Sequence, residues 1–403
     1  MNILWLSHFV PYPPKGGNLQ RSFNLLKEVA KENRVFLLAF NQKTLLPTEE
    51  KLEEGVKQLS SFCKYIQVFD IPCERSVWFW IKLLLANLFS PLPYSIKRFH
   101  SEKMAKAIHR IIRNHEIDLV HFDTIALAEF RKSLTGPKKV LNHHNIESAL
   151  LLSRARREKS LLKRFYLLLQ GNKLNKYESK TCGEFALNIL VSQVDKERLE
   201  ESCPKIEAEI IPNGVDTDYF TISGGQVRRN NLVFAGGMSW FPNRDAILYF
   251  YEKIWPLLKK EIADISFTLI GSHPPKEIAN WGKKDKIEVL GFVEDVRPYL
   301  ARATVYVVPI RAGGGTRLKI LDAFACGKAV ISTSIGCEGL EVTPGRNILI
   351  GDSPGEFAEQ VMKVCTDGDL MKSLGREGRK LVEEKYSWKT IGDNLNRIYE
   401  NLI

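Results

Sequence analysis

The sequence predicts an α/β protein with two Rossmann-like domains, each built on a doubly wound parallel sheet. Three observations lead to this prediction. The chain has 403 residues, which is longer than a single hydrophobic core usually spans. Short apolar runs alternate with amphipathic segments along nearly its whole length, which is typical of strand–helix–strand units. Both halves also open in the same way, with an apolar strand, a glycine-bearing loop and a helix.

The first half contains six apolar runs that we expect to form strands. They cover residues 3–7, 35–40, 65–69, 118–122, 139–143 and 187–191. Amphipathic segments such as 18–31 and 101–113 separate most of these runs and should form the covering helices. The longest apolar run, 77–89, is too short to cross a bilayer, which takes about 20 residues.

The second half repeats this plan. Its expected strands cover residues 231–236, 265–271, 286–291, 304–309, 328–332 and 347–350. A Pro-Asn-Gly turn that begins at Pro212 interrupts the pattern between the halves. We therefore expect one domain over residues 1–213, a second over 214–385, and a terminal helix over 386–403.

Composition and charge narrow the class of protein. The chain is 44% hydrophobic and 26% charged, which is ordinary for a globular enzyme. Its seven cysteines form no C-x-x-C pair, so the sequence predicts neither a disulfide framework nor a structural zinc site. The cysteine pattern fits free thiols in a reducing cytoplasm, and no signal peptide is visible at the start. Nearly all of the net charge lies in residues 1–213, which carry +10, against +1 for the rest.

The stretch GGGTRLKILDAFACGKAV, residues 313–330, reads as a glycine-rich loop that runs into a helix. A helix N-terminus presents unpaired N–H groups, and glycines let a ligand approach the backbone, so this junction favours phosphate binding. Arg317 and Lys319 can add charge-assisted bonds, and Asp322 can accept from ribose hydroxyls. An ordinary structural loop is the alternative. Neither a P-loop nor a G-x-G-x-x-G motif is present, which argues against a P-loop NTPase and a dinucleotide oxidoreductase.

This stretch, extended to Leu340, and the runs PNGVDTDYF, VFAGGMSWFPNRDAILYF and VLGFVEDVRPYLARATVYVVPIR resemble glycosyltransferase family 4. The similarity is greatest to bacterial sugar transferases of surface-polysaccharide assembly. The resemblance implies the GT-B fold, in which two Rossmann-like domains face a cleft and a C-terminal helix crosses back onto the first domain. It also implies retaining transfer of a sugar from a nucleotide-diphosphate sugar of the UDP or GDP type, without a metal or other cofactor.

The chain departs from the family pattern at two places. The family's Glu-x7-Glu signature corresponds here to Gly314 and Asp322, so the first carboxylate is absent. Gly237 stands at the position of a family arginine, and the nearest cation is Arg244. The resemblance therefore implies a donor-binding set made of Gly16, Gly17, Arg244, Gly314, Gly315, Thr316, Arg317, Lys319 and Asp322.

Two strand ends supply candidate catalytic residues. The resemblance implies that His144, in the run LNHHNIES, points at the donor sugar, whereas His143 should point the opposite way on an extended strand. Asp123 ends another strand and could hydrogen-bond the acceptor. A histidine with a purely structural role is the alternative. We expect Asp216 and Asp218 to serve turn chemistry, not a metal.

The run 154–180 predicts one basic amphipathic helix. We expect it to meet an anionic membrane or the acceptor through Arg154, Arg156, Arg157, Lys163 and Arg164. An ordinary solvated helix face is the alternative, and residues 77–89 are the second amphipathic candidate. No aromatic-basic motif supports nucleic-acid binding. The expected partners are thus the nucleotide-sugar, a glycan or lipid-linked acceptor and a membrane surface, with the protein cytoplasmic or peripheral on the inner face of the cell membrane.

Two other functions stay open on the sequence alone. Because the first family carboxylate is absent at Gly314, the chain could be a catalytically inactive, transferase-like subunit that binds a nucleotide. A nucleotide-sugar epimerase shares the architecture, but it requires a set of carboxylates and a histidine that we do not find.

Overall fold

The computed structural model describes residues 1–222, 226–283, 286–312 and 316–403, and these form two compact units. Unit 1 comprises Met1–Pro212 and Ile391–Ile403, and unit 2 comprises Asn213–Thr390. The division after Pro212 lies one residue from the expected boundary. The last helix, α16 (Trp388–Leu402), begins in unit 2 and belongs to unit 1 from Ile391 onward. The predicted fold class, two parallel sheets with covering helices, is confirmed.

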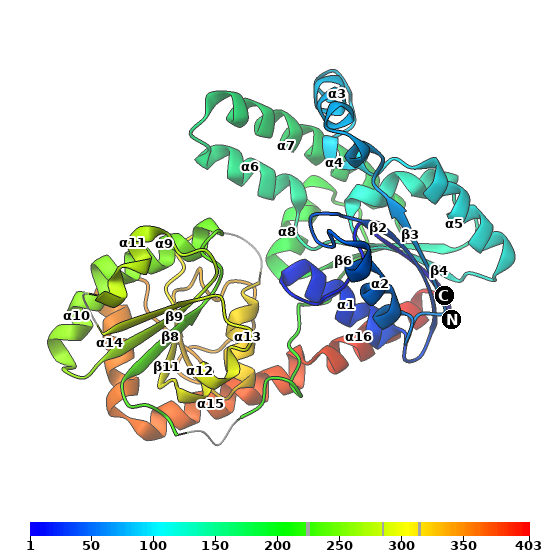
Figure 1. The fold of residues 1–403 in the computed structure, drawn as a ribbon. Helices are drawn as coiled ribbons and strands as arrows, with labels where there is room; N and C mark the ends of the chain where they lie inside the picture. The colour runs from blue at the N-terminus through cyan, green and yellow to red at the C-terminus, as the bar shows by residue number, and fades with distance from the viewer. Residues whose placement is uncertain (223–225, 284–285, 313–315) are drawn as a thin grey trace. The chain divides into compact units, whose positions relative to one another are not determined.

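The sheet of unit 1 has seven strands in the order β3-β2-β1-β4-β5-β6-β7, and every neighbouring pair is parallel (Figure 1). The strands are β1 (Asn2–Ser7), β2 (Arg34–Asn41), β3 (Tyr65–Asp70), β4 (Leu119–Phe122), β5 (Lys138–Asn142), β6 (Leu187–Leu190) and β7 (Ala208–Ile210). The central strands β1 and β4 are almost entirely buried, as a sheet with helices on both faces requires. The three-residue edge strand β7 was not expected from the sequence.

Helices cover this sheet on both faces. The helices of unit 1 are α1 (Gly17–Val29), α2 (Glu49–Leu59), α3 (Val77–Leu88), α4 (Tyr94–Arg98), α5 (Glu102–Asn114), α6 (Glu147–Arg157), α7 (Leu161–Thr181) and α8 (Gln193–Ser202), with 3-10 turns at Pro72–Arg75, Ile125–Ser133 and Cys182–Glu184. Helix α16 joins them from the far end of the chain, because Gly392 leaves room for the Glu28 side chain of α1. Asn33 also donates to Asn396 at 3.0 Å.

The sheet of unit 2 has six parallel strands in the order β10-β9-β8-β11-β12-β13. They are β8 (Asn231–Ala235), β9 (Ser266–Ile270), β10 (Ile287–Gly291), β11 (Val305–Val308), β12 (Ala329–Ser332) and β13 (Leu349–Ile350). The order turns back at β8, where β11 pairs on one side and β9 on the other. Such a switch point is where open parallel sheets bind their ligands, beyond the carboxyl ends of the strands.

The helices of unit 2 alternate with these strands. They are α9 (Phe241–Tyr249), α10 (Trp255–Glu261), α11 (Lys276–Ala279), α12 (Arg297–Arg302), α13 (Leu318–Ala325), α14 (Pro354–Thr366) and α15 (Gly368–Leu381), with a 3-10 turn at Trp281–Lys283 and π turns at Phe250–Ile254 and Val382–Tyr386. Helix α14 opens with a capping box between Ser353 and Glu356. Its apolar face, including Phe357 and Val361, packs into the core of the unit.

The expected single helix over 154–180 is wrong. The chain forms α6 and α7, two helices that pack on each other and are separated by residues 158–160. Ser160 precedes the first turn of α7, where serine commonly begins a helix. Gly171 permits the close packing, since a Cβ there would lie 2.8 Å from Cδ2 of Leu152.

Within the described ranges, no helix combines the length and the hydropathy that a membrane span needs.

Candidate functional site

Polar side chains gather at the carboxyl ends of three neighbouring strands of unit 1, around Asp123. Its carboxylate follows β4 and is completely buried. Ser22 donates to it at 2.6 Å, Ser7 at 3.3 Å and Asn142 at 3.2 Å. Burial raises the pKa of this carboxyl, but His144 and His121 beside it outweigh burial, so the pKa lies well below its ordinary value. Asp123 is therefore a fixed, buried negative charge.

His144 lies against this carboxylate. Its Nε2 is 3.4 Å from Oδ1 of Asp123, and its side chain is only 6% exposed. Neither ring nitrogen has a hydrogen-bond partner among the residues that the structure describes. A buried imidazole without partners is costly unless a ligand supplies them. His143, its neighbour, points into the sheet instead, with Nε2 3.1 Å from Oδ1 of Asn188.

Two further histidines surround Asp123, and burial keeps both neutral. Burial lowers the pKa of His8 to about 3, and it lowers the pKa of His121 as well. The ring of His121 stacks on Trp5 at 3.6 Å, and its Nδ1 hydrogen-bonds the Tyr399 hydroxyl of α16 at 2.6 Å. Its Nε2 is 3.9 Å from Oδ1 of Asp123. His121 thus links Tyr399 of the C-terminal helix to Asp123.

Arg21 of α1 links this cluster to the end of unit 1. Its guanidinium donates to Oδ1 of Asn142 and to the carbonyl of Pro212, each at 2.9 Å. Burial lowers the pKa of Arg21 to about 10, which still leaves it charged at neutral pH. The sequence analysis did not single out Arg21, Ser7, Ser22 or Asn142. Two of them, Ser7 and Asn142, are the last residues of β1 and β5, and that position was the available signal.

The glycines after β1 lie at the start of α1. Gly16 precedes the helix with φ +92°, a conformation that L side chains rarely adopt, and Gly17 is its first residue. Both are exposed.

In unit 2, the side chain of Lys319 extends from the first turn of α13 to the carboxyl end of the central strand β8. Its Nζ donates to Oδ1 of Asn243 at 2.7 Å and lies 4.0 Å from the ring centroid of Phe234. A Cβ at Gly236 would collide with this Nζ and would lie 2.7 Å from Nδ2 of Asn243, so a side chain there would displace the Lys319–Asn243 pair. Burial, with a smaller effect of Arg317, lowers the pKa of Lys319 to about 7. The structure thus holds a poorly solvated ammonium at the switch point.

Asp322 follows one turn later on α13. Its Oδ1 is buried and has no hydrogen-bond partner within the described ranges. Burial raises the pKa of this carboxyl to about 7, although Lys319 opposes the effect. An unsatisfied buried carboxyl oxygen is expensive, and a ligand hydroxyl would satisfy it.

The remaining donor-set residues are placed unevenly. Arg317 precedes α13, is 3% exposed, and has its guanidinium 5.5 Å from the centroid of Trp240. The Thr316 hydroxyl is buried, and it too finds no partner in the part of the chain that the structure describes. Gly314 and Gly315 lie outside the described residues. Arg244 is exposed in the first turn of α9.

The paired aspartates between the units form a turn, as expected. Oδ1 of Asp216 accepts from the backbone N–H groups of Asp218 and Tyr219, at 3.1 and 2.8 Å. Among the described residues no group of three or more His, Cys, Asp or Glu side chains is arranged to hold a metal ion.

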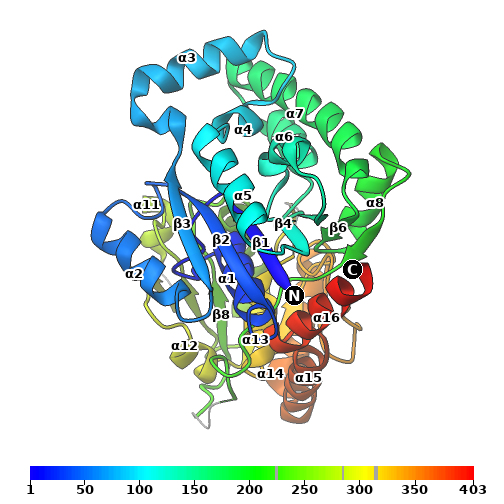
Figure 2. The same cartoon turned by 90° about the vertical axis from the view of Figure 1, so that its right-hand side faces the viewer.

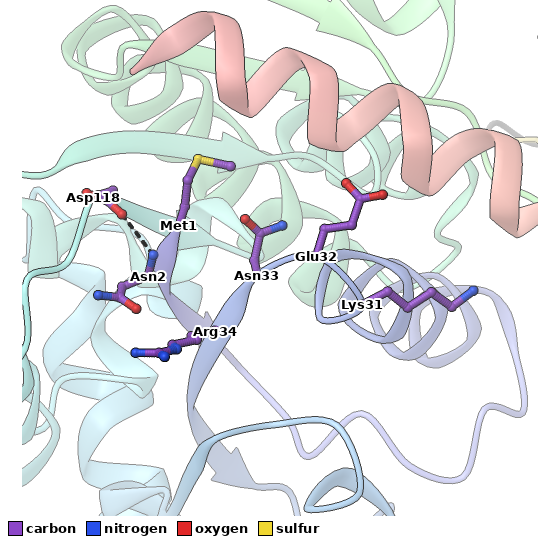
Figure 3. A pocket seen from close by; sticks show the side chains of 7 residues that line it. All are labelled: Met1, Asn2, Lys31, Glu32, Asn33, Arg34 and Asp118. Atoms are coloured by element: carbon purple, nitrogen blue, oxygen red, sulfur yellow. Dashed lines mark hydrogen bonds between the residues drawn. The ribbon is translucent and has the colours of Figure 1, made fainter.

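A pocket of about 510 Å³ opens at the amino-terminal edge of the unit 1 sheet (Figure 3). The backbone N–H of Asn2 donates to Oδ2 of Asp118 there, at 2.8 Å. The pocket is lined by Met1, Asn2, Lys31, Glu32, Asn33, Arg34 and Asp118. Parallel sheets of this kind bind ligands at the opposite, carboxyl edge, so we do not assign it to the donor.

Two protein-family models match the chain, one in each half. The model described as Glycosyltransferase Family 4 matches residues 69–219, and the model described as Glycosyl transferases group 1 matches residues 229–367. The chain belongs to the GT4-type glycosyltransferases. Its relatives include an uncharacterized glycosyltransferase of Methanocaldococcus jannaschii, 26% identical over 304 residues, which are 72% of this chain and 78% of the relative.

A second relative of this GT4-type glycosyltransferase is an uncharacterized 44.6 kDa protein in the cps region of Klebsiella pneumoniae. The two are 23% identical over 363 residues, 86% of this chain and 88% of the relative. Among solved structures, sucrose-phosphate synthase from Thermosynechococcus elongatus matches with a TM-score of 0.69 at 17% identity, covering 100% of this chain and 99% of that one. Anabaena HepE in complex with UDP matches with a TM-score of 0.64 at 17% identity, covering 100% of both chains. The glycosyltransferase therefore has the GT-B fold.

The basic residues that we expected on a membrane or acceptor face are on two helices of this glycosyltransferase. Arg154 and Arg156 are exposed on α6, and Lys163 and Arg164 are exposed on α7. The side chain of Arg157 lies outside the described part of the chain.

Proposed function

We propose that this glycosyltransferase moves a sugar from a UDP- or GDP-type sugar nucleotide to a glycan or lipid-linked acceptor, with retention and without a metal. The observation that carries the proposal is the Lys319 ammonium, poorly solvated beside Gly236 at the switch point of the unit 2 sheet. The oxygens of a diphosphate would accept charge-assisted hydrogen bonds from this ammonium and replace the water that burial removes.

Unit 2 would bind the nucleotide. In our proposal Lys319 and Arg317 neutralise the diphosphate, which leaves with a growing negative charge as the glycosidic bond breaks. They would thereby do the work that a divalent cation does in other phosphate chemistry. Asp322 would accept from the ribose hydroxyls through its unsatisfied Oδ1. The UDP complexes solved for Anabaena HepE support a uridine nucleotide as the first donor to test.

Unit 1 would act at the sugar. Nε2 of His144 faces Oδ1 of Asp123 at 3.4 Å, and its buried Nδ1 has no hydrogen-bond partner within the described ranges, so Nδ1 can bond a sugar hydroxyl. We assign Asp123 a positioning role in place of the acceptor contact expected from the sequence, because it is completely buried and already accepts three hydrogen bonds. Its negative charge would stabilise the positive charge that develops as the sugar becomes oxocarbenium-like.

Retention follows in our proposal from this division of roles. Asp123, buried and saturated with hydrogen bonds, is poorly placed to attack the anomeric carbon. The acceptor hydroxyl would instead enter on the face that the diphosphate leaves and pass its proton to the departing phosphate. His144 would orient the sugar without abstracting that proton.

Two observations concern the acceptor side of the proposal. A relative encoded in the Klebsiella cps region favours cell-surface polysaccharide or glycoconjugate assembly. The exposed cations on α6 and α7 favour a protein that works peripherally on the anionic inner face of the cell membrane.

The experiment adds UDP- and GDP-sugars one at a time and records the thermal unfolding midpoint, then measures nucleoside diphosphate release with and without EDTA. We expect one donor to raise the midpoint selectively and to turn over equally in EDTA. Selective binding without turnover would instead support an inactive subunit. Turnover that EDTA abolishes would contradict the metal-free mechanism.

A further inference from the structure

Helix α3 reverses the usual pattern of a surface helix, because a polar side chain is buried and apolar side chains are exposed. It is twelve residues long, VWFWIKLLLANL, and its one buried residue is the polar Asn87. Leu83 packs against the core of unit 1, but most of the large apolar side chains of α3 face solvent: Trp78 is 79% exposed, and Val77, Phe79, Trp80 and Leu85 are also exposed, followed by Phe89 at 93%. Contiguous exposed apolar surface of this kind marks an interaction site.

Polar bonds fasten α3 to the protein. Gln170 of α7 donates to Oδ1 of Asn87 at 2.6 Å, and Lys173 donates to the carbonyls of Asn87 and Leu88 at 2.7 and 3.1 Å. The Trp80 indole donates to the Tyr94 hydroxyl at 2.9 Å. Figures 1 and 2 both show α3 at the outer edge of unit 1, beside α4. Because these polar bonds hold one side of α3 against α7, its apolar side faces outward.

Positive charge lies close to this face. Gln170, which holds α3, is seven residues from Lys163, or about 10 Å along α7. Lys163 and Arg164 are exposed there, and the same end of α7 exposes Leu161, Leu162 and Phe165, with Leu162 at 85%. Apolar side chains mixed with cations, and without acids on α3 or at this end of α7, fit an anionic apolar surface.

We propose that α3 lies in the headgroup region of an anionic phospholipid bilayer as the apolar anchor of this enzyme. The inference rests on the peripheral membrane role in the proposed function and names the element that carries it. Tryptophan favours the bilayer interface, and a helix of twelve residues lies in the plane of that interface because it cannot span it. The cations of α6 and α7 then supply an electrostatic attraction that salt weakens, and α3 supplies an apolar contribution that salt leaves unchanged.

The anchor would also place a pocket of unit 1 at the bilayer surface. Val77 and Trp80 line a pocket of about 430 Å³ together with Lys43, Thr44 and Tyr94. It opens beyond the carboxyl ends of β2 and β3, on the sheet edge that also carries Asp123. A lipid-linked acceptor whose tail stays in the bilayer could reach this edge without leaving the membrane.

Vesicle co-sedimentation with the full chain tests the proposal, using phosphatidylglycerol–phosphatidylcholine vesicles and pure phosphatidylcholine as the neutral control. Trp78→Glu/Phe79→Glu should lower partitioning onto anionic vesicles by at least about tenfold, since it withdraws two apolar side chains and adds repulsion. The matched control, Leu257→Glu/Phe292→Glu, adds the same charge at exposed apolar sites of unit 2 and should bind like wild type. Brominated phosphatidylglycerol should quench tryptophan fluorescence, and Trp78→Phe should reduce the quenching.

The possible outcomes distinguish a failure of the proposed membrane anchor from a failure of the proposed function. Equal partitioning of Trp78→Glu/Phe79→Glu and wild type, with matching thermal unfolding, would overturn the proposal. So would a lipid-free dimer in light scattering that this variant dissociates, because a second copy would then cover α3. Donor hydrolysis, which needs no membrane, should be unchanged in the variant. If wild type binds vesicles but no sugar nucleotide, the proposed function fails and the anchor stands.

Discussion

Lys319→Met should stabilise the free protein while it weakens the donor complex. Burial holds the pKa of Lys319 at about 7, against 10.5 for an ordinary lysine. Each unit of pKa corresponds to about 1.4 kcal/mol, so keeping this ammonium charged costs at most about 5 kcal/mol. The lost bond to Asn243 and the partial solvent contact of the side chain reduce the gain, and we expect the free energy of unfolding to rise by about 1–3 kcal/mol.

The sign of the pH dependence follows from the lowered pKa. The penalty for the charged form is complete below pH 7, shrinks as the folded protein loses the proton above pH 7, and vanishes near 10.5, where the unfolded chain also loses it. The stabilisation by Lys319→Met should therefore be largest below pH 7 and fade toward pH 10. Urea unfolding at several pH values measures it.

The donor complex should respond in the opposite direction. Loss of one charge-assisted bond to phosphate is worth roughly 1.5–3 kcal/mol, or about 10- to 150-fold in the dissociation constant of the sugar nucleotide, measured by calorimetry. Lys328→Met is the matched control. Lys328 is also half-buried, and it donates to the carbonyls of Ala301 and Ala303, at 2.8 and 3.5 Å, away from the switch point, so its loss should leave donor binding unchanged. A Lys319→Met protein that is less stable at every pH, or that binds the donor normally, would refute the reasoning.

Four further results are expected. Asp322→Asn should weaken sugar-nucleotide binding with the fold intact. A donor that carries 2′,3′-dideoxyribose should bind wild type about as weakly as the normal donor binds the variant. If wild type binds the normal and the dideoxy donor equally well, Asp322 does not contact the ribose. His144→Ala should lower kcat by more than it raises the donor KM, since contacts near the reacting centre act mostly in the transition state; an unchanged kcat would refute that role. Tyr399→Phe should lower the free energy of unfolding by about 1 kcal/mol in urea, because His121 loses its partner, and no loss would mean that the contact is idle. Sugar-nucleotide affinity should fall as pH rises from 7 to 9 because Lys319 loses its charge, and a flat profile would argue against that cation.

The sequence was most informative about the sheets. All twelve expected strands are present, because each is an apolar run bounded by turn residues, and the central strands are buried, as parallel strands between helix layers must be. The break between α6 and α7 was missed, since both helices carry helical periodicity and Ser160 is the one local sign of a new start. Strand β7 was missed because three residues give no period to detect.

The candidate site was predictable only in part. Lys319 and Asp322 could be named from the sequence because both follow a glycine-rich loop and lie one helix turn apart. The partners of Asp123 were not found, because Ser22 and Ser7 are 101 and 116 residues away from it in the chain and only the fold brings them together. Tyr399 was out of reach for the same reason. The pairing of His121 with Tyr399 depends on the return of α16 to unit 1, and no local pattern encodes that contact.

NMR spectroscopy of the released sugar tests most directly whether this GT4-type chain cleaves a sugar nucleotide with retention, as we propose. Each UDP- and GDP-sugar is incubated with the protein in EDTA, and the first anomer to appear is recorded before mutarotation mixes the two. We predict that one donor is cleaved, that its nucleoside diphosphate and sugar appear together, and that the first anomer has the configuration of the donor. Release of the opposite anomer would contradict retention, and a protein that cleaves none of the donors, alone or with glycan and lipid-linked acceptors, would contradict the proposed function itself.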